Sequence, residues 1–131
     1  SKMRFEVTGS GDVNCDNIVC DDVNINVTGS GDVDINHVAT ETLSASVTGS
    51  GDIELSGKAT RVAYSVTGSG DISASGLRAD IVEASVSGSG DISCFAEVRL
   101  DAKVTGSGDI VYKGDPDVVN VHGKKGSVTR R

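Results

Sequence analysis

One heptapeptide occurs six times along this chain of 131 residues, at almost equal intervals. It reads Val-Thr-Gly-Ser-Gly-Asp followed by Val or Ile, except that serine replaces threonine in the fifth copy. The copies start 18 to 20 residues apart, at Val7, Val27, Val47, Val66, Val86 and Val104. Such a period is typical of repeat proteins, in which each unit buries its apolar side against the next unit.

Apolar residues occupy every second position before and after each heptapeptide. In the first unit, Phe5 and Val7 precede the Gly-Ser-Gly segment, and Val13 and Cys15 follow it. This alternation is typical of half-buried β-strands. Each unit is therefore predicted to hold two short strands and a connector. Connectors such as residues 16–22 and 56–61 absorb the differences in spacing.

Identical units stacked about 4.8 Å apart would meet the same surroundings in every copy. A sandwich of hairpins does not require equal spacing, and a propeller blade needs about twice this length. The repeat thus predicts an all-β, single-domain, parallel β-helix over residues 1–131, with about six and a half coils of 17–20 residues. It should be right-handed, because crossovers between parallel strands almost always are.

The glycines agree with this fold. Twelve of the 17 glycines lie in the heptapeptides, where the chain must turn a corner or approach a neighbouring backbone. The same glycine content argues against a helical bundle. In the last coil, lysines replace the Ser-Gly-Asp part, and charges protect an exposed strand edge. We therefore interpret residues 118–131 as an imperfect capping coil.

The formal net charge of −7 argues against a nucleic-acid partner or a basic membrane-binding face. No run of 18 apolar residues is present, so no membrane span is expected. No signal peptide is recognised in the chain.

If the valines point inward, the polar residues of the heptapeptide point outward and form three stacked ladders. These ladders are the candidate binding residues. They comprise Thr8, Thr28, Thr48, Thr67, Ser87 and Thr105; Ser10, Ser30, Ser50, Ser69, Ser89 and Ser107; and Asp12, Asp32, Asp52, Asp71, Asp91 and Asp109.

The aspartate ladder requires compensation, because carboxylates about 4.8 Å apart repel by about 1 kcal/mol even in water. Hydrogen bonds from backbone amides or hydroxyls at the Gly-Ser-Gly bend would supply it. Bound calcium is the alternative, although the RTX motif Gly-Gly-x-Gly-x-Asp matches poorly. The Thr-x-Ser spacing only roughly imitates ice-binding Thr-x-Thr ladders. We predict no cofactor and no metal site.

Catalysis finds little support in the sequence. His37 and His122 occupy unrelated positions and are expected at the surface. A Gly-Ser-Gly segment repeated six times indicates structure, since an enzyme uses one nucleophile. Cys15 and Cys94 share one repeat position about 19 Å apart, too far for a disulfide, and are expected in the core. Cys20 lies in the first connector.

The six copies of Gly-Ser-Gly-Asp-(Ile/Val), within residues 3–128, resemble the bacterial family called putative auto-transporter adhesin, head GIN domain. The resemblance implies a right-handed β-helix of the pectin-lyase type in an exported protein, located in the periplasm or at the outer cell surface. It also implies a role in adhesion, with no catalytic residues to transfer.

These observations favour a non-catalytic exported or surface module that presents its ladders to a glycan or protein partner. The alternative is a structural scaffold or a self-association domain that forms a homo-oligomer. An enzyme acting on polyuronic acid is a third, weaker hypothesis.

Overall fold

The structure, a computed structural model, describes residues 2–123 and 128–130. Strands in this part of the chain form one nine-stranded sheet in which every pairing is parallel. Neighbours follow the order of the sequence from β1 to β7, after which β9 pairs with β7 and β8 pairs with β6. The strands are β1 (Lys2–Gly9), β2 (Asp12–Gly29), β3 (Asp32–Gly49), β4 (Asp52–Gly68), β5 (Asp71–Gly88), β6 (Asp91–Gly106), β7 (Asp109–Lys113), β8 (Val118–Gly123) and β9 (Val128–Arg130).

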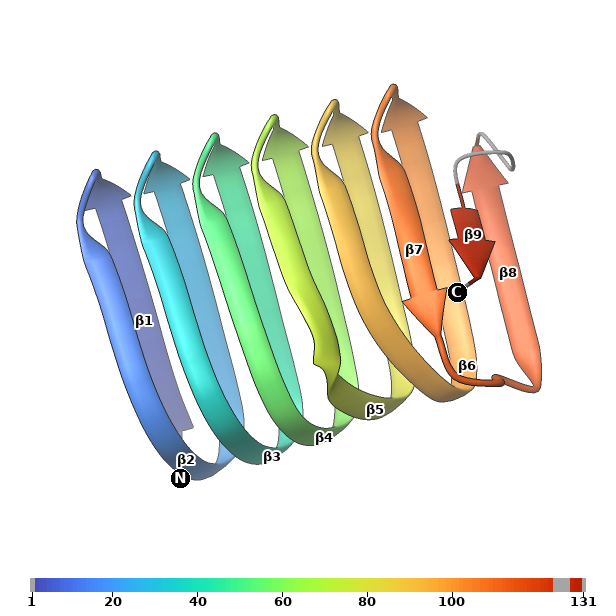
Figure 1. Ribbon diagram of the computed structural model, residues 1–131, viewed down its shortest axis with the longest axis horizontal. Helices are drawn as coiled ribbons and strands as arrows, with labels where there is room; N and C mark the ends of the chain where they lie inside the picture. Colours follow the sequence, from blue (N-terminus) through green and yellow to red (C-terminus); the bar gives the residue numbers. More distant parts are fainter. Residues whose placement is uncertain (1, 124–127, 131) are drawn as a thin grey trace.

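The sheet winds into a coil with two walls (Figure 1). Each of β2 to β6 descends along the near wall, bends at the lower edge and ascends along the far wall. A Gly-Ser-Gly corner at the upper edge leads into the next coil. Because the chain rises behind and descends in front while advancing from β1 to β7, the coil is right-handed. The predicted parallel β-helix is confirmed.

The connectors are part of the strands, which differs from the expected two short strands per unit. In the first connector, Val19 pairs with Ala39 and Cys20 with Thr40. The connectors also absorb the changes in spacing, as predicted. The register shifts between Ile35 and Val38, where the repeat shortens from 20 to 19 residues.

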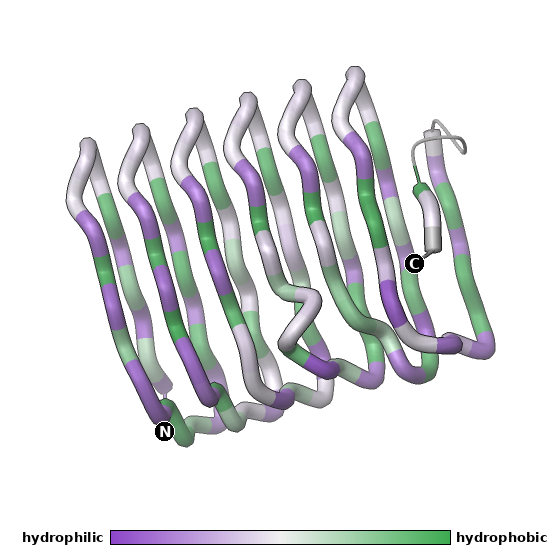
Figure 2. The backbone as a smooth tube through the Cα atoms, viewed as in Figure 1, coloured by the Kyte–Doolittle hydropathy of each residue, from purple (hydrophilic) through white to green (hydrophobic). Residues whose placement is uncertain are grey.

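Outside the connectors, equivalent residues of successive units lie side by side. Val7 pairs with Val27 and Asp12 with Asp32, and the same register continues along the stack. Hydrophobic residues of successive coils align into bands that run along both walls (Figure 2). The buried valines and isoleucines of the heptapeptides include Val27, Val47, Val66, Val86, Val104, Val33, Ile53, Ile72, Ile92 and Ile110. No polar or charged residue belongs to the buried set of the described chain.

The core includes residues that the alternating pattern does not reveal. Ile18, Val38 and Leu77 lie in connectors and are buried, so that they fill the lower edge of the solenoid. Asn17 and His37 turn this edge with a left-handed backbone, each with φ of 59°. Left-handed backbone is several-fold enriched in Asn and His among non-glycine residues.

Tyr64 is the largest side chain that is fully buried. It stacks in register between Ala45 and Ala84, whose small side chains leave room for its ring. Its hydroxyl has no hydrogen-bond partner in the described structure. Desolvation, with a smaller electrostatic contribution from Cys94, raises the pKa of Tyr64 well above its ordinary value.

The first glycine of each later corner performs both expected tasks, whereas the second only approaches the neighbouring backbone. Gly29 has φ of +108°, and a β-carbon there would lie 2.7 Å from the carbonyl oxygen of Gly9. Gly31 has no left-handed φ, but a β-carbon on it would overlap the carbonyl oxygen of Gly11. Ser30 joins its corner to the preceding one by donating its amide hydrogen to Gly9 O at 2.9 Å.

At the far end, β8 extends the far wall beyond β6, and β9 extends the near wall beyond β7. The role of residues 118–131 as a capping coil stays a prediction. Its lysines, Lys124 and Lys125, lie outside the described residues.

Candidate functional site

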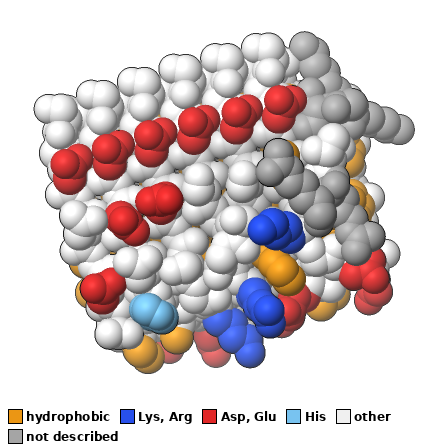
Figure 3. Space-filling model, in the orientation of Figure 1, with side chains coloured by type: hydrophobic (Ala, Val, Ile, Leu, Met, Phe, Trp, Pro, Cys, Tyr) orange, Lys and Arg blue, Asp and Glu red, His pale blue; other side chains and the backbone are white. Residues whose placement is uncertain are grey.

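The three ladders line the upper edge of the solenoid. All eighteen ladder side chains are exposed. Threonine ends the far-wall part of each coil, serine occupies the corner, and aspartate starts the near-wall part. The polar face expected from the sequence is therefore folded over an edge, because the Gly-Ser-Gly corner separates the threonines from the aspartates. Figure 3 shows the aspartates as a continuous row of carboxylates along the near wall.

Among the described residues, backbone amides donate to ladder carboxylates only at Asp71 and Asp91, in the C-terminal half of the ladder. Asp71 Oδ1 accepts a hydrogen bond from the amide of Asp91 at 3.0 Å, and Asp91 Oδ1 accepts one from the amide of Asp109 at 3.1 Å. At the other end, the amides of Asp32 and Asp52 donate to glycine carbonyl oxygens instead, at 3.2 and 3.3 Å. The donors are aspartate amides of the next coil, where the sequence suggested amides or hydroxyls of the bend itself.

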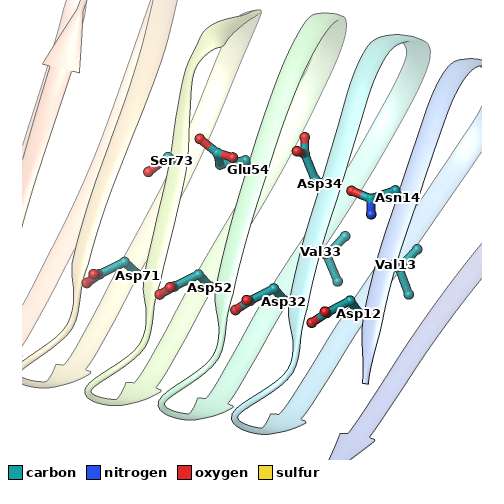
Figure 4. Close-up of a pocket in the computed structure, with 10 residues that line it drawn as sticks. All are labelled: Asp12, Val13, Asn14, Asp32, Val33, Asp34, Asp52, Glu54, Asp71 and Ser73. Carbon is teal, nitrogen blue, oxygen red and sulfur yellow. The ribbon is translucent and has the colours of Figure 1, made fainter. Parts of the chain in front are cut away.

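A second polar column runs beside the aspartate ladder on the near wall (Figure 4). It consists of the residue two positions after each ladder aspartate, which has the same outward parity. Its members in the first four coils are Asn14, Asp34, Glu54 and Ser73. Together with four ladder aspartates they line an open groove of about 410 Å³, with Val13 and Val33 also in its lining.

The groove is acidic and lacks compensating cations. Within residues 2–123 and 128–130, no Lys, Arg or His forms an ion pair with a ladder aspartate, Asp34 or Glu54. The ion pairs of this part are made elsewhere, such as Arg4–Glu6 at 2.9 Å and Arg99–Asp101 at 3.1 Å. Sequence reasoning missed Asp34 and Glu54, although their parity with the ladder would have placed them here.

A smaller polar cluster lies on the far wall. Asn120 Nδ2 donates to Asp101 Oδ1 at 2.8 Å, and Arg99 Nε donates to Asp101 Oδ2. The hydrogen bond from Asn120, followed by the hydrogen bond and charge of Arg99, holds the pKa of Asp101 below its ordinary value. This cluster joins β6 to β8 and therefore supports the last coil.

The remaining candidates for chemistry lie apart from the groove. Cys94 is buried, as predicted, and desolvation raises the pKa of its thiol to about 12. Cys15 is half-buried and packs against the core. Both histidines have exposed side chains. In the described ranges, no group of three or more His, Cys, Asp or Glu side chains is arranged to hold a metal ion.

A family model described as "Putative auto-transporter adhesin, head GIN domain" matches residues 2–116. The chain belongs to this family. The head GIN domain described here is also similar to solved bacterial structures. A crystal structure of a putative lipid binding protein from Parabacteroides distasonis ATCC 8503 is 33% identical, with a TM-score of 0.88, over 100% of this chain and 56% of that one.

Two further structures are described as putative adhesins. One, from Parabacteroides distasonis ATCC 8503, is 28% identical with a TM-score of 0.84, over 98% of this chain and 56% of that one. The other, from Bacteroides fragilis NCTC 9343, is 26% identical with a TM-score of 0.75, over 98% of this chain and 90% of that one. The chain thus spans little more than half of the two Parabacteroides chains. No curated protein matched it, and its described residues contain no helix suited to crossing a membrane.

Proposed function

We propose that this head GIN domain is a non-catalytic binding module, exported or displayed at the cell surface, that contacts a protein or glycan through its ladders. The observation that carries the proposal is the exposure of all eighteen ladder side chains, repeated once per coil along one edge. A regular array of weak contacts binds an extended partner through many points at once.

The charge of the groove favours a protein partner with a row of Lys or Arg side chains. Uncompensated carboxylates attract such a surface and orient it during encounter. A sugar ring would find no fully exposed aromatic face to stack on, because Phe5, Phe95 and Tyr112 are half-buried and Tyr64 is buried. The guanidinium of Arg78 also covers the Phe95 ring, at 5.3 Å from its centroid.

The relative described as lipid binding raises the question of a lipid ligand for this chain. The carboxylates of the groove would repel anionic headgroups. A lipid is therefore a weaker candidate than a basic protein surface.

The test uses labelled domain on a glycan array and on an array of extracellular proteins. The double variant Asp32→Asn/Asp52→Asn removes two ladder charges without changing side-chain shape. Its control, Glu41→Gln/Glu83→Gln, removes two charges from exposed positions outside the ladders.

For a basic protein ligand, we expect the ladder variant to lose about tenfold in affinity or more, and the wild-type affinity to fall with added salt. For a glycan ligand, Thr48→Ala/Ser50→Ala should abolish binding. The proposal fails if neither array yields a ligand, or if the ladder and control variants behave alike.

A further inference from the structure

A second pocket, of about 270 Å³, adjoins the acidic groove on the near wall, on the side of the lower edge. This lower pocket spans β3, β4 and β5, in the middle of the solenoid, so that β2 and β6 flank it. Its polar side chains form two rows that cross these three strands. The first row, which it shares with the groove, is visible in Figure 4. The rows are Asp34, Glu54 and Ser73, then Asn36, Ser56 and Ser75.

A bulge in β5 bounds the lower pocket on one side. Three residue steps lead from Ser73 to Gly76 in β5, whereas two lead from Glu54 to Ser56 in β4. The mismatch of β5 against β6 is larger still, and the near-wall part of β5 is visibly kinked (Figure 2). Bulges of this kind redirect side chains. Ser75 and Gly76, which belong to the bulge, line the pocket, and no residue of β6 does.

The first row and the bulge supply hydrogen-bond acceptors that are not in use. The carboxylates of Asp34 and Glu54 have no hydrogen bond or ion pair with another described residue. The hydroxyls of Ser73 and Ser75 are likewise without a partner in this part of the chain. No Lys, Arg or His lines the pocket. A bound group would therefore find two carboxylates and two hydroxyl oxygens free to accept hydrogen bonds.

The second row already uses part of its donor capacity. Asn36 Nδ2 donates to Asp16 Oδ1 at 3.0 Å, and Ser56 Oγ donates to Asn36 Oδ1 at 3.4 Å. These bonds link three successive coils and fix the Asn36 side chain. The pocket is thus rich in acceptors and poor in donors, so it suits a ligand that donates hydrogen bonds and accepts none.

We propose that the lower pocket receives an arginine side chain of a protein partner and selects arginine over lysine. This inference rests on the proposed function, because it names the residue that a basic partner inserts beside the ladders. A guanidinium group is planar, carries five N–H donors and has no acceptor. A lysine ammonium has three donors on one atom and is more strongly hydrated, so it gains less from the same acceptors.

The carboxylates and the serines have different roles in this selection. Asp34 and Glu54 are paired on neighbouring strands, about 4.8 Å apart, and attract any cation. The hydroxyls of Ser73 and Ser75 carry no charge, and they accept the donors that remain once a guanidinium has reached the carboxylates. Ser73 and Ser75 are therefore the residues that determine specificity, and their effect is separable from that of net charge.

The test is isothermal titration calorimetry of the 131-residue chain with two blocked peptides of about eight residues. Arg alternates with Thr in one peptide and Lys with Thr in the other, so that in an extended strand all cations project from one face. We expect the arginine peptide to bind about fivefold more tightly or better.

The decisive variant is Ser73→Ala/Ser75→Ala, which leaves the charge of the pocket unchanged. It should weaken the arginine peptide, leave the lysine peptide nearly unaffected and bring the two affinities to within about twofold. The matched control, Ser44→Ala/Ser85→Ala, makes the same change on the far wall and should preserve the preference. Both variants should melt close to wild type, because the serines that they replace have no hydrogen-bond partner among the described residues.

A second variant, Asp34→Asn/Glu54→Gln, removes the two charges of the pocket. It should weaken the binding of both peptides, and that of the arginine peptide by the larger factor. The ladder variant Asp32→Asn/Asp52→Asn should instead weaken the two peptides by similar factors, because the ladder aspartates lie outside the lower pocket.

The outcomes separate this inference from the proposed function. Equal affinity of wild type for the two peptides, with both weakened by the ladder variant, would overturn the arginine pocket and leave the basic partner in place. A preference for arginine that survives in Ser73→Ala/Ser75→Ala would also overturn it. If neither peptide binds, the basic partner and the arginine pocket fail together.

Discussion

The close stacking of corner backbones predicts that the same Gly→Ala substitution lowers the unfolding free energy at one corner and does not lower it at the equivalent position of another. The substitution is Gly51→Ala, and the matched control is Gly11→Ala. A β-carbon at Gly51 would overlap the carbonyl oxygen of Gly31 and lie 2.6 Å from Val27 Cγ1. At Gly11 the nearest atom is 3.9 Å away. Neither glycine has a left-handed backbone, so only the neighbouring coil distinguishes the two sites.

Forcing a methyl group into a packed site typically costs about 1 to 3 kcal/mol. The obstructing atom is a backbone oxygen of the preceding coil and cannot easily move aside. We therefore expect Gly51→Ala to lower the unfolding free energy by about 2 kcal/mol. With an unfolding entropy of about 2.1 cal/mol/K per residue over 131 residues, this lowers the melting temperature by about 7 °C. For Gly11→Ala, the reduced conformational entropy of the unfolded chain should stabilise the folded domain by up to about 1 kcal/mol.

Thermal unfolding followed by far-ultraviolet circular dichroism measures both variants at the same protein concentration. Urea unfolding gives the same comparison at constant temperature. Equal melting temperatures for the two variants would refute the reasoning, because the strain would then not come from the stacked backbone.

Three further predictions concern buried and hydrogen-bonded groups. Tyr64→Phe should raise the unfolding free energy by about 1 kcal/mol, since it removes a buried hydroxyl that lacks a partner; a lower melting temperature would contradict this. The folded-state pKa of Asp101 is depressed, so its stabilisation is present above about pH 5 and is lost as the pH falls through 4 and below. The stability advantage of wild type over Asp101→Asn should shrink in that window, and an advantage that is constant with pH would exclude the mechanism. Cys94, with a buried thiol and a pKa of about 12, should resist iodoacetamide at pH 8 until the domain unfolds, as mass spectrometry of labelled peptides would show; rapid native labelling would contradict its burial.

The alternating residues predicted the walls well because the side-chain period of a strand is two, and parallel stacking repeats the same surroundings in each coil. Val27 and Ile53, for instance, are buried as their parity requires. At the lower edge of the solenoid, the alternation of residues did not predict which side chains are buried. Ile18 and Leu77 enter the core from connectors of different length, where the backbone turns and parity is lost.

The candidate site shows the same division. The ladders follow from the repeat, and the threonine and aspartate ladders lie in register as expected. Their arrangement around a corner does not follow from the repeat alone, because the glycines between Thr8 and Asp12 allow either a corner or a close approach to a neighbouring backbone, and the repeat does not decide between the two. The acidic groove likewise appears only when Asp34 and Glu54 are placed beside the ladder.

The sequence alone determined the parallel stack, since only coils repeated in one direction put the same residue next to itself six times. Tertiary structure decided which neighbours each repeated residue meets. A β-carbon at Gly51 would overlap a glycine oxygen of the preceding coil, whereas one at Gly11 would make only an ordinary side-chain contact. The amide of Asp91 donates to an aspartate carboxylate, whereas the amide of Asp32 donates to a glycine oxygen. Identical sequence units differ in this way because, within the described residues, the first coil pairs with a neighbour on one side only, and because each aspartate amide has both a glycine oxygen and a carboxylate of the preceding coil within reach.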